Sequence, residues 1–227
     1  YRPDQLHISF LFYNESSVMF RRKPIIEKIG DWDEVLSGGD FEWIERVKKM
    51  FGDDAFAEMP PGLLTLLIQN QTQPFFYKNV YLIGNAKEYV ESFRHYHQSG
   101  ASLYYRYPHA YRPFPVPESI KPDADQQSRH FDIVLVSDFR IVGGSTKSNV
   151  EEIKANIRLG YRTGLVQMSR YDVDPSWSIL PEVRDLIDGD RVSMIVYGEH
   201  VSCDLLILRY PPVLQEWQQY IPNIEAK

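Results

Sequence analysis

Apolar and polar positions follow two different periods along this chain. After residue 130, short apolar runs predict buried strands at 131–136, 163–168, 193–197 and 204–208. Segments with helical spacing lie between them at 149–159 and 181–187, and an amphipathic segment follows at 214–220. Near-continuous apolar strands separated by helices are typical of a parallel sheet with covered faces. We therefore expect residues 130–227 to form a partial doubly wound, Rossmann-like α/β half domain.

The first 110 residues mix the same two patterns. Alternation or short apolar runs predict strands at 6–12, 79–83 and 102–107, and helical spacing predicts helices at 40–51, 60–68 and 85–99. We expect a smaller α/β or α+β lobe, an N-terminal extension over residues 1–110. The aromatic run at 104–111 fits either a half-buried strand or a surface that stacks on sugars or a partner.

A proline-rich segment separates these two parts. Within residues 111–129, four prolines alternate with polar residues, which leaves little room for a helix or a sheet ladder: Pro113, Pro115, Pro117 and Pro122. We interpret this segment as a linker between the two lobes.

Composition excludes several classes of protein. The 227 residues carry a net charge of −6, and the longest basic cluster is Arg21-Arg22-Lys23, which we expect in a solvated loop before Pro24. This argues against a nucleic-acid partner. No apolar stretch is long enough for a transmembrane segment and no signal-peptide pattern is present, so we expect a cytoplasmic protein. The single cysteine, Cys203, excludes a multi-cysteine metal site and fits a packed thiol better than a nucleophile.

The strongest candidate site is the loop after the first strand of the second part. Gly143 and Gly144 permit close approach of the backbone, and Ser145 and Thr146 add hydroxyl donors just before a helix start near Asn149. This chemistry suits a sugar diphosphate. The loop is neither a Walker loop nor a G-x-G-x-x-G fingerprint. The alternative is a tight turn capped by Ser148 or Asn149.

Other polar residues offer weaker candidates. Asp138 follows the first strand directly, where it either caps the turn or binds an acceptor hydroxyl. His200 is either a surface histidine or an acceptor contact. Asp172-Val173-Asp174 is similar to a D-x-D metal motif, but it precedes Pro175 in a polar stretch, and we expect a solvated loop. His95 and His97 are two apart on a helix, so they point to different faces and do not share a metal.

Several segments of the second part together resemble the N-terminal half of GT-B glycosyltransferases. The later strand and its loop look like those of bacterial retaining members. The resemblance covers about residues 130–225 and rests on DIVLVSDFR at 132–140, Gly143–Gly144, NVEEI at 149–153, GYRTGLVQ at 160–167 and DLLILRYPPVLQ at 204–215.

This resemblance implies an enzyme that transfers a sugar from a nucleotide-sugar donor to an acceptor. It implies that this domain holds the acceptor, while Gly143, Gly144, Ser145 and Thr146 face the donor diphosphate, with no metal or other cofactor. Arg209 stands where many retaining relatives place a histidine on the transferred sugar, and an arginine there would pair with phosphate instead. The resemblance further implies a C-terminal donor domain that is missing from this chain, so we expect the chain alone to be inactive.

Two rival functions remain open at this point. A non-catalytic nucleotide- or sugar-binding module, or a protein-interaction module, would use the same fold. A Rossmann-type methyltransferase is a weaker alternative, because this chain lacks the G-x-G loop that such an enzyme has after its first strand. Gln167-Met168-Ser169 also replaces the acidic residue expected after the second strand.

Overall fold

A computed structural model of the chain describes residues 20–57, 84–107, 112–122, 129–174 and 176–227. The strands predicted at 6–12 and 79–83 and the helix predicted at 60–68 lie outside these residues. Within the described part of the chain, no helix combines the length and apolar character needed to cross a bilayer.

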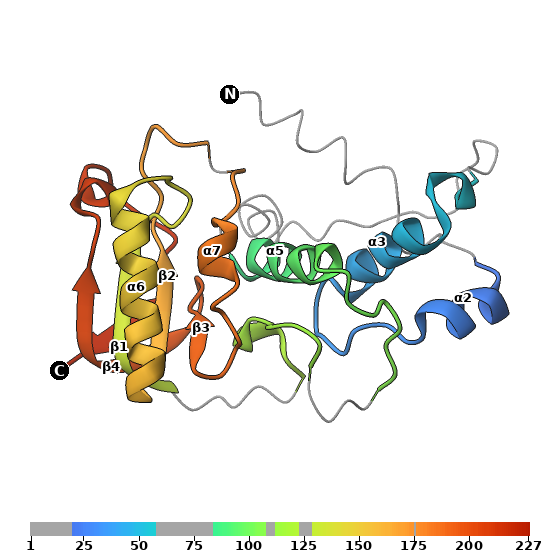
Figure 1. The fold of residues 1–227 in the computed structure, drawn as a ribbon, viewed down its shortest axis with the longest axis horizontal. Helices are drawn as coiled ribbons and strands as arrows, with labels where there is room; N and C mark the ends of the chain where they lie inside the picture. Colours follow the sequence, from blue (N-terminus) through green and yellow to red (C-terminus); the bar gives the residue numbers. More distant parts are fainter. Residues whose placement is uncertain (1–19, 58–83, 108–111, 123–128, 175) are drawn as a thin grey trace, which may run out of the picture.

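The second part of the chain is built on a five-stranded, all-parallel sheet (Figure 1). The strand order is β3-β2-β1-β4-β5, with bounds β1 Arg129–Ser137, β2 Thr163–Gln167, β3 Val192–Met194, β4 His200–Leu208 and β5 Asn223–Ala226. The central strands β1 and β4 pair from Arg129 with Val201 to Val136 with Leu208. This arrangement confirms the Rossmann-like α/β fold class.

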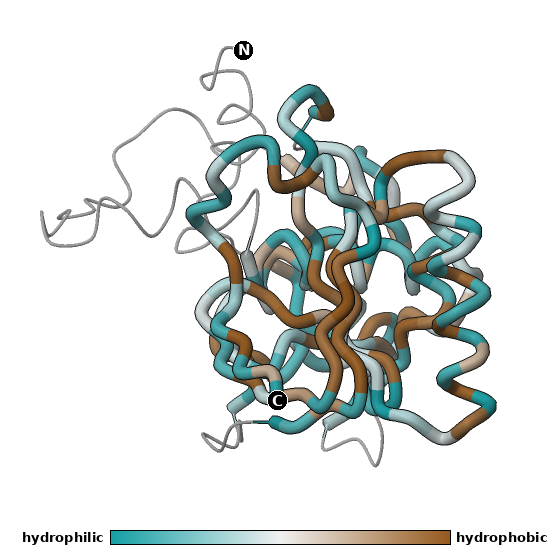
Figure 2. The backbone as a smooth tube through the Cα atoms, turned by 90° about the vertical axis from the view of Figure 1, so that its left-hand side faces the viewer, coloured by the Kyte–Doolittle hydropathy of each residue, from teal (hydrophilic) through white to brown (hydrophobic). Residues whose placement is uncertain are grey.

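The two faces of the sheet are covered differently. Helices α6 (Gly144–Leu159) and α7 (Pro181–Arg184) cover one face, where Ile153 and Val183 pack against Leu135 and Leu165. On the other face, Val213 of the 3-10 helix η4 (Pro211–Leu214) packs against Val134 and its neighbours. Figure 2 shows the apolar strands running through the middle of the molecule. Cys203 is buried in this second cluster, which confirms the packed thiol.

The first part of the chain contributes mainly helices to the described residues. These are α2 (Arg22–Ile29), α3 (Gly39–Phe51), η2 (Asp53–Ala55), α5 (Asn85–Gln98) and η3 (Glu118–Ile120). The predictions of α3 and α5 are confirmed. The basic triplet Arg21–Lys23 is exposed as expected, but the loop predicted there is wrong, because α2 begins at Arg22. Pro24 lies in the first turn, where a helix needs no backbone N–H donor.

The strand predicted at 102–107 is also wrong. Only Tyr105 forms a bridge there, to Gly30, and its side chain is buried under the guanidinium of Arg46, 3.8 Å from the ring centroid. Gly30 is required at this contact, since its φ is 73° and a Cβ would collide with the Tyr105 carbonyl. The aromatic residue therefore serves the core of the first lobe.

Several boundaries in the second part differ from expectation. β3 ends at Met194 rather than at 197, and β4 begins at His200 rather than at 204. Helix α6 begins at Gly144, five residues earlier than predicted, and α7 is shorter than the predicted 181–187. The amphipathic segment at 214–220 begins at the last residue of the 3-10 helix η4, continues without regular structure and leads into β5. β5 has only four residues, too few for a periodic signal.

The segment expected to be a linker packs closely against α5 over its described residues 112–122. Phe114, Val116 and Ile120 are buried together with Tyr89 and Phe93 of α5. The hydroxyl of Ser92 donates a hydrogen bond to the Pro115 carbonyl at 2.6 Å. This segment thus completes the core of the first lobe.

Candidate functional site

The glycine pair forms the start of α6 rather than a free loop. Gly143 is the N-cap residue and provides no side-chain cap, so the N–H groups of Gly144 and Ser145 begin the helix without one. A Cβ on Gly143 or Gly144 would meet open space, and the φ of 165° at Gly143 is ordinary extended backbone. This 16-residue helix therefore starts without a side-chain cap and with open space beside its first residues, and we call it uncovered in this sense.

Two polar side chains near this turn, the hydroxyl of Thr146 and the amide of Asn149, point into the protein. Thr146 is fully buried and its hydroxyl donates to the carbonyl of Ile141. Asn149 does not cap the turn; its amide donates to the Ser137 hydroxyl at 3.0 Å. The backbone at Gly143–Ser145 thus remains the part of the predicted loop that is open to a ligand.

The start of α6 lies where open α/β sheets bind ligands. The chain proceeds outward from β1 through β2 to β3, then returns to the other side of β1 for β4 and β5. The topological switch point is therefore between β1 and β4, and α6 follows β1 at its carboxyl end.

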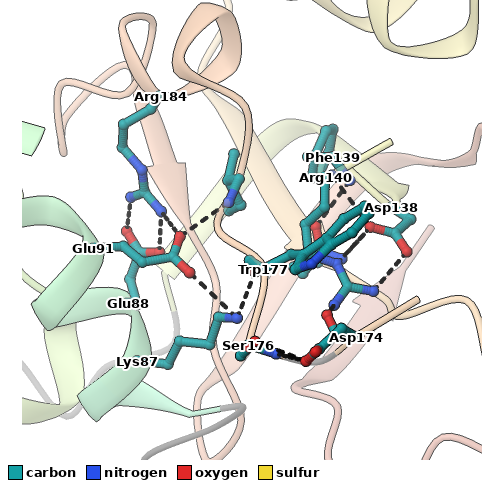
Figure 3. Close-up of polar contacts among 12 residues, drawn as sticks. Lys87, Glu88, Glu91, Asp138, Phe139, Arg140, Asp174, Ser176, Trp177 and Arg184 are labelled. Atoms are coloured by element: carbon teal, nitrogen blue, oxygen red, sulfur yellow. Dashed lines mark hydrogen bonds and ion pairs between the residues drawn. The ribbon is translucent and has the colours of Figure 1, made fainter. Parts of the chain in front are cut away.

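The carboxylate of Asp138, directly after β1, is hydrogen-bonded by other groups of the protein (Figure 3). Its carboxylate is 2% exposed and accepts two bonds from the Arg140 side chain, both at 2.8 Å, together with bonds from Gln167 and from the backbone N–H groups of Arg140 and Arg170. Burial acts to raise the Asp138 pKa, but these hydrogen bonds outweigh it and hold the pKa below its ordinary value. This geometry favours the turn cap over the acceptor contact.

The two remaining predicted contacts lie at opposite edges of the sheet. Arg209 follows β4 at the carboxyl edge and forms an ion pair with Glu152 of α6, with a half-exposed side chain. His200 begins β4 at the amino edge, 3.2 Å from Glu225 and 3.1 Å from Asn223. His200 therefore does not join Gly143 and Arg209 in one site.

A cavity of about 350 Å³ lies at the carboxyl ends of β2 and β3, and the sequence patterns did not predict it. Gln167 and Met194 end these strands and line it, while Lys87 and Glu91 of α5 form another wall. The remaining wall comes from the segment after η4, with Trp217 and Tyr220. No local signal joins these segments, because α5 and Trp217 are separated by more than half the chain.

Charged groups around this cavity are paired with one another. Lys87 donates to the Trp177 carbonyl at 2.8 Å and lies 3.3 Å from Glu91 (Figure 3). Burial lowers the Lys87 pKa, partly offset by the Glu91 carboxylate. Arg184 of α7 holds both Glu88 and Glu91, and burial raises the Glu88 pKa although the Arg184 charge opposes this.

A second cavity, of about 410 Å³, lies in the first lobe beside the start of α3. Asp33 on its wall accepts bonds from the hydroxyls of Tyr89 and Tyr107 and from Arg112. These three donors satisfy the carboxylate within the protein. We assign no chemistry to this cavity.

The remaining sequence candidates are structural. Asp172 pairs with Arg170, and the Asp174 carboxylate accepts bonds from Ser176, so both act within their own loop. His95 pairs with Asp185 while the buried His97 pairs with Glu42, on different faces of α5 as predicted. Within the residues the structure describes, no three metal-ligating side chains gather as a metal site would require.

No family model and no curated protein matches this chain. Function therefore has to be argued from two features of the carboxyl edge, namely the uncovered start of α6 and the cavity beside α5.

Proposed function

We propose that residues 129–227 form the acceptor-side half of a glycosyltransferase that uses a nucleotide-sugar donor. The proposal is carried by the start of α6 at the switch point of a parallel sheet, which has no side-chain cap and has open space where side chains on Gly143 and Gly144 would begin. A helix start of this kind attracts the phosphates of a ligand. The resemblance of residues 132–167 and 204–215 to GT-B enzymes supports the same reading.

In this proposal, the start of α6 stabilises the leaving group of the transfer. The bond from the anomeric carbon to the diphosphate oxygen breaks while the acceptor hydroxyl oxygen bonds to that carbon. Negative charge builds on the departing nucleoside diphosphate, which takes up the proton that the acceptor hydroxyl loses. N–H groups at Gly144 and Ser145 would neutralise part of that charge as it develops. Arg209 lies at the same edge and adds a cation, which its partner Glu152 holds in place.

A charge placed at Gly144 tests this site. Gly144→Glu should weaken binding of pyrophosphate and UDP, because its carboxylate would repel the anion, whereas Gly144→Gln adds similar bulk without the charge. The Cβ atom that either substitution adds would meet open space. The Glu variant should keep the melting temperature or raise it slightly, since an acid at a helix start stabilises by about 0.3–1 kcal/mol.

The readout is the backbone amide NMR signals of residues 143–146 during titration with pyrophosphate, UDP and GDP. We expect shifts at these amides with millimolar affinity, because one half of a cleft binds weakly, and equal shifts in the Gln variant. The absence of shifts at these amides, or equal binding by the Glu and Gln variants, would refute the phosphate site.

The rival function is a non-catalytic nucleotide- or sugar-binding module. The cavity beside α5 favours it, since described residues of both parts of the chain line this cavity. Extending the titration to a nucleotide sugar separates the two, because low-micromolar affinity for that ligand would favour the module over half of a cleft.

A further inference from the structure

We propose that the cavity at the carboxyl ends of β2 and β3 is a subsite for an uncharged sugar ring, with the indole of Trp217 as its stacking face. The identity of this sugar as part of the acceptor rests on the proposed function; the binding of a sugar ring does not. The proposal is carried by the size, charge and wall chemistry of the cavity.

The size of the cavity fits a small ligand. Its volume of about 350 Å³ lies within the range typical of small-molecule sites, about 300–1,000 Å³. It opens at the carboxyl edge of the sheet, the edge on which parallel α/β folds bind ligands. Arg140 lines it and stands three residues before Gly143, so the cavity adjoins the start of α6 along the chain.

The charges on its walls favour an uncharged ligand. Lys87 is matched by Glu91, Glu88 by Arg184, and Arg140 by Asp138, with the last two pairs buried. An ionic ligand would have to compete with one of these partners, and breaking a buried pair costs more than it returns. A neutral polar molecule meets no such competition.

The walls combine apolar and aromatic surfaces with hydrogen-bonding groups. Met194, Ile195 and Val196 provide an apolar strip at the end of β3. Tyr197 lies beside it, 43% exposed, with its ring edge-on to Tyr220 at 5.4 Å. A pyranose has the same division, with C–H faces that pack on rings and hydroxyl edges that need donors and acceptors.

The indole of Trp217 is the aromatic wall group that packs least against the rest of the described protein. Its side chain is 92% exposed although it lines the cavity, so it offers nearly a whole aromatic face to a ligand. The neighbouring Gln218 is anchored, because its amide nitrogen donates to the carbonyls of Ser169 at 2.8 Å and Val213 at 3.2 Å. Neither bond uses its amide oxygen, which remains an acceptor for a hydroxyl.

The test is a titration of the full chain with four uncharged sugars: methyl β-glucoside, methyl β-galactoside, methyl α-mannoside and cellobiose. The readout is the NMR signals of the Trp217 indole and of residues 194–197. We expect at least one sugar to shift both sets of signals. Trp217→Ala should weaken that binding about five- to tenfold, the range that loss of an aromatic contact gives, while Trp217→Phe retains most of it.

The matched control is Trp177→Ala, which removes another exposed indole that does not line the cavity. It should leave sugar binding unchanged, and none of the three variants should lower the melting temperature. Failure of every sugar to shift these signals at tens of millimolar would overturn the proposal, as would unchanged binding by Trp217→Ala. Shifts at 194–197 with UDP but no sugar would also overturn it, since the cavity would then take the nucleotide.

The two proposals fail separately in these experiments. Pyrophosphate reports on residues 143–146 and the neutral sugars report on residues 194–197. Sugar binding without phosphate binding would leave the cavity assigned and remove the transfer reaction.

Discussion

The guanidinium of Arg184 in α7 holds the carboxylate of Glu88 in α5, and both side chains are buried where the first lobe meets the helices of the sheet. The same guanidinium donates to Glu91 at 2.8 Å. One arginine thus forms ion pairs with two carboxylates of a different lobe, and Glu91 also pairs with Lys87.

Replacing this arginine should be costly. Arg184→Met leaves the buried Glu88 without its cation and Glu91 with Lys87 alone, and it should destabilise the protein by about 3–5 kcal/mol at pH 7 in urea unfolding. Arg94→Met is the control, since it breaks an exposed pair with Glu45 and should cost less than about 1 kcal/mol. A cost below that of the control would show that the buried pair does not hold the lobes.

The cost of Arg184→Met should shrink in acid. Burial already raises the Glu88 pKa, and loss of the cation raises it further. A carboxyl whose folded pKa is raised destabilises the fold above that pKa, and stability returns as pH falls through it toward the unfolded value of about 4.3. Urea unfolding from pH 7 to pH 4.5 measures this. A constant penalty across that range would contradict the assignment to Glu88.

Asp138 should stabilise the protein at neutral pH. Its pKa lies below the ordinary value, so its contribution is present above about pH 4 and is lost as pH falls further through its folded pKa. Asp138→Asn should cost about 2–4 kcal/mol at pH 7, because the Arg140 charge loses its partner. The exposed Asp172→Asn serves as control, and the two variants should converge at low pH.

A side chain on Gly164 in β2 should destabilise the protein. A Cβ there would lie 2.4 Å from Cδ1 of Ile195, which is itself buried over the strand. Gly164→Ala should therefore cost about 1–3 kcal/mol by overpacking. Ile195→Val removes the colliding methyl group, so a double-mutant cycle should show partial rescue. Gly144→Ala, with open space around it, is the neutral control.

The thiol of Cys203 should resist modification. It is buried between the sheet and Val213, and burial raises its pKa, so little thiolate forms and reagents cannot reach it. Iodoacetamide at pH 7.5 should label it only after unfolding in guanidinium chloride. Rapid labelling of the folded protein would contradict this packing.

Local patterns predicted the elements whose burial repeats with a regular period. The central strands β1, β2 and β4 and the helices α3 and α5 have enough residues for the period to be visible. β5 and α7 have four residues each and do not. The early start of α6 was missed because Gly143–Ser148 favours a loop by composition, whereas burial of Thr146 and Asn149 against β1 favours the helix.

The candidate site likewise has one part that the sequence predicts and one part that it does not. The start of α6 could be located from a glycine pair after an apolar strand, since this signal is contiguous. The cavity could not, because Lys87, Met194 and Trp217 come together only through tertiary packing. His200 was a candidate for its proximity to a strand, but a parallel register places the first residue of β4 at the edge far from Gly143.

The ion pairs of α5 have a mechanical consequence for the cavity. Glu88 and Glu91 line it and also anchor α7 through Arg184, so one set of contacts both forms a wall and fastens it to the sheet. A hinge motion between the lobes would have to break these buried pairs before the wall could move. A shortened protein that begins at residue 112 would retain the strands of the sheet but lose the wall of the cavity that α5 forms.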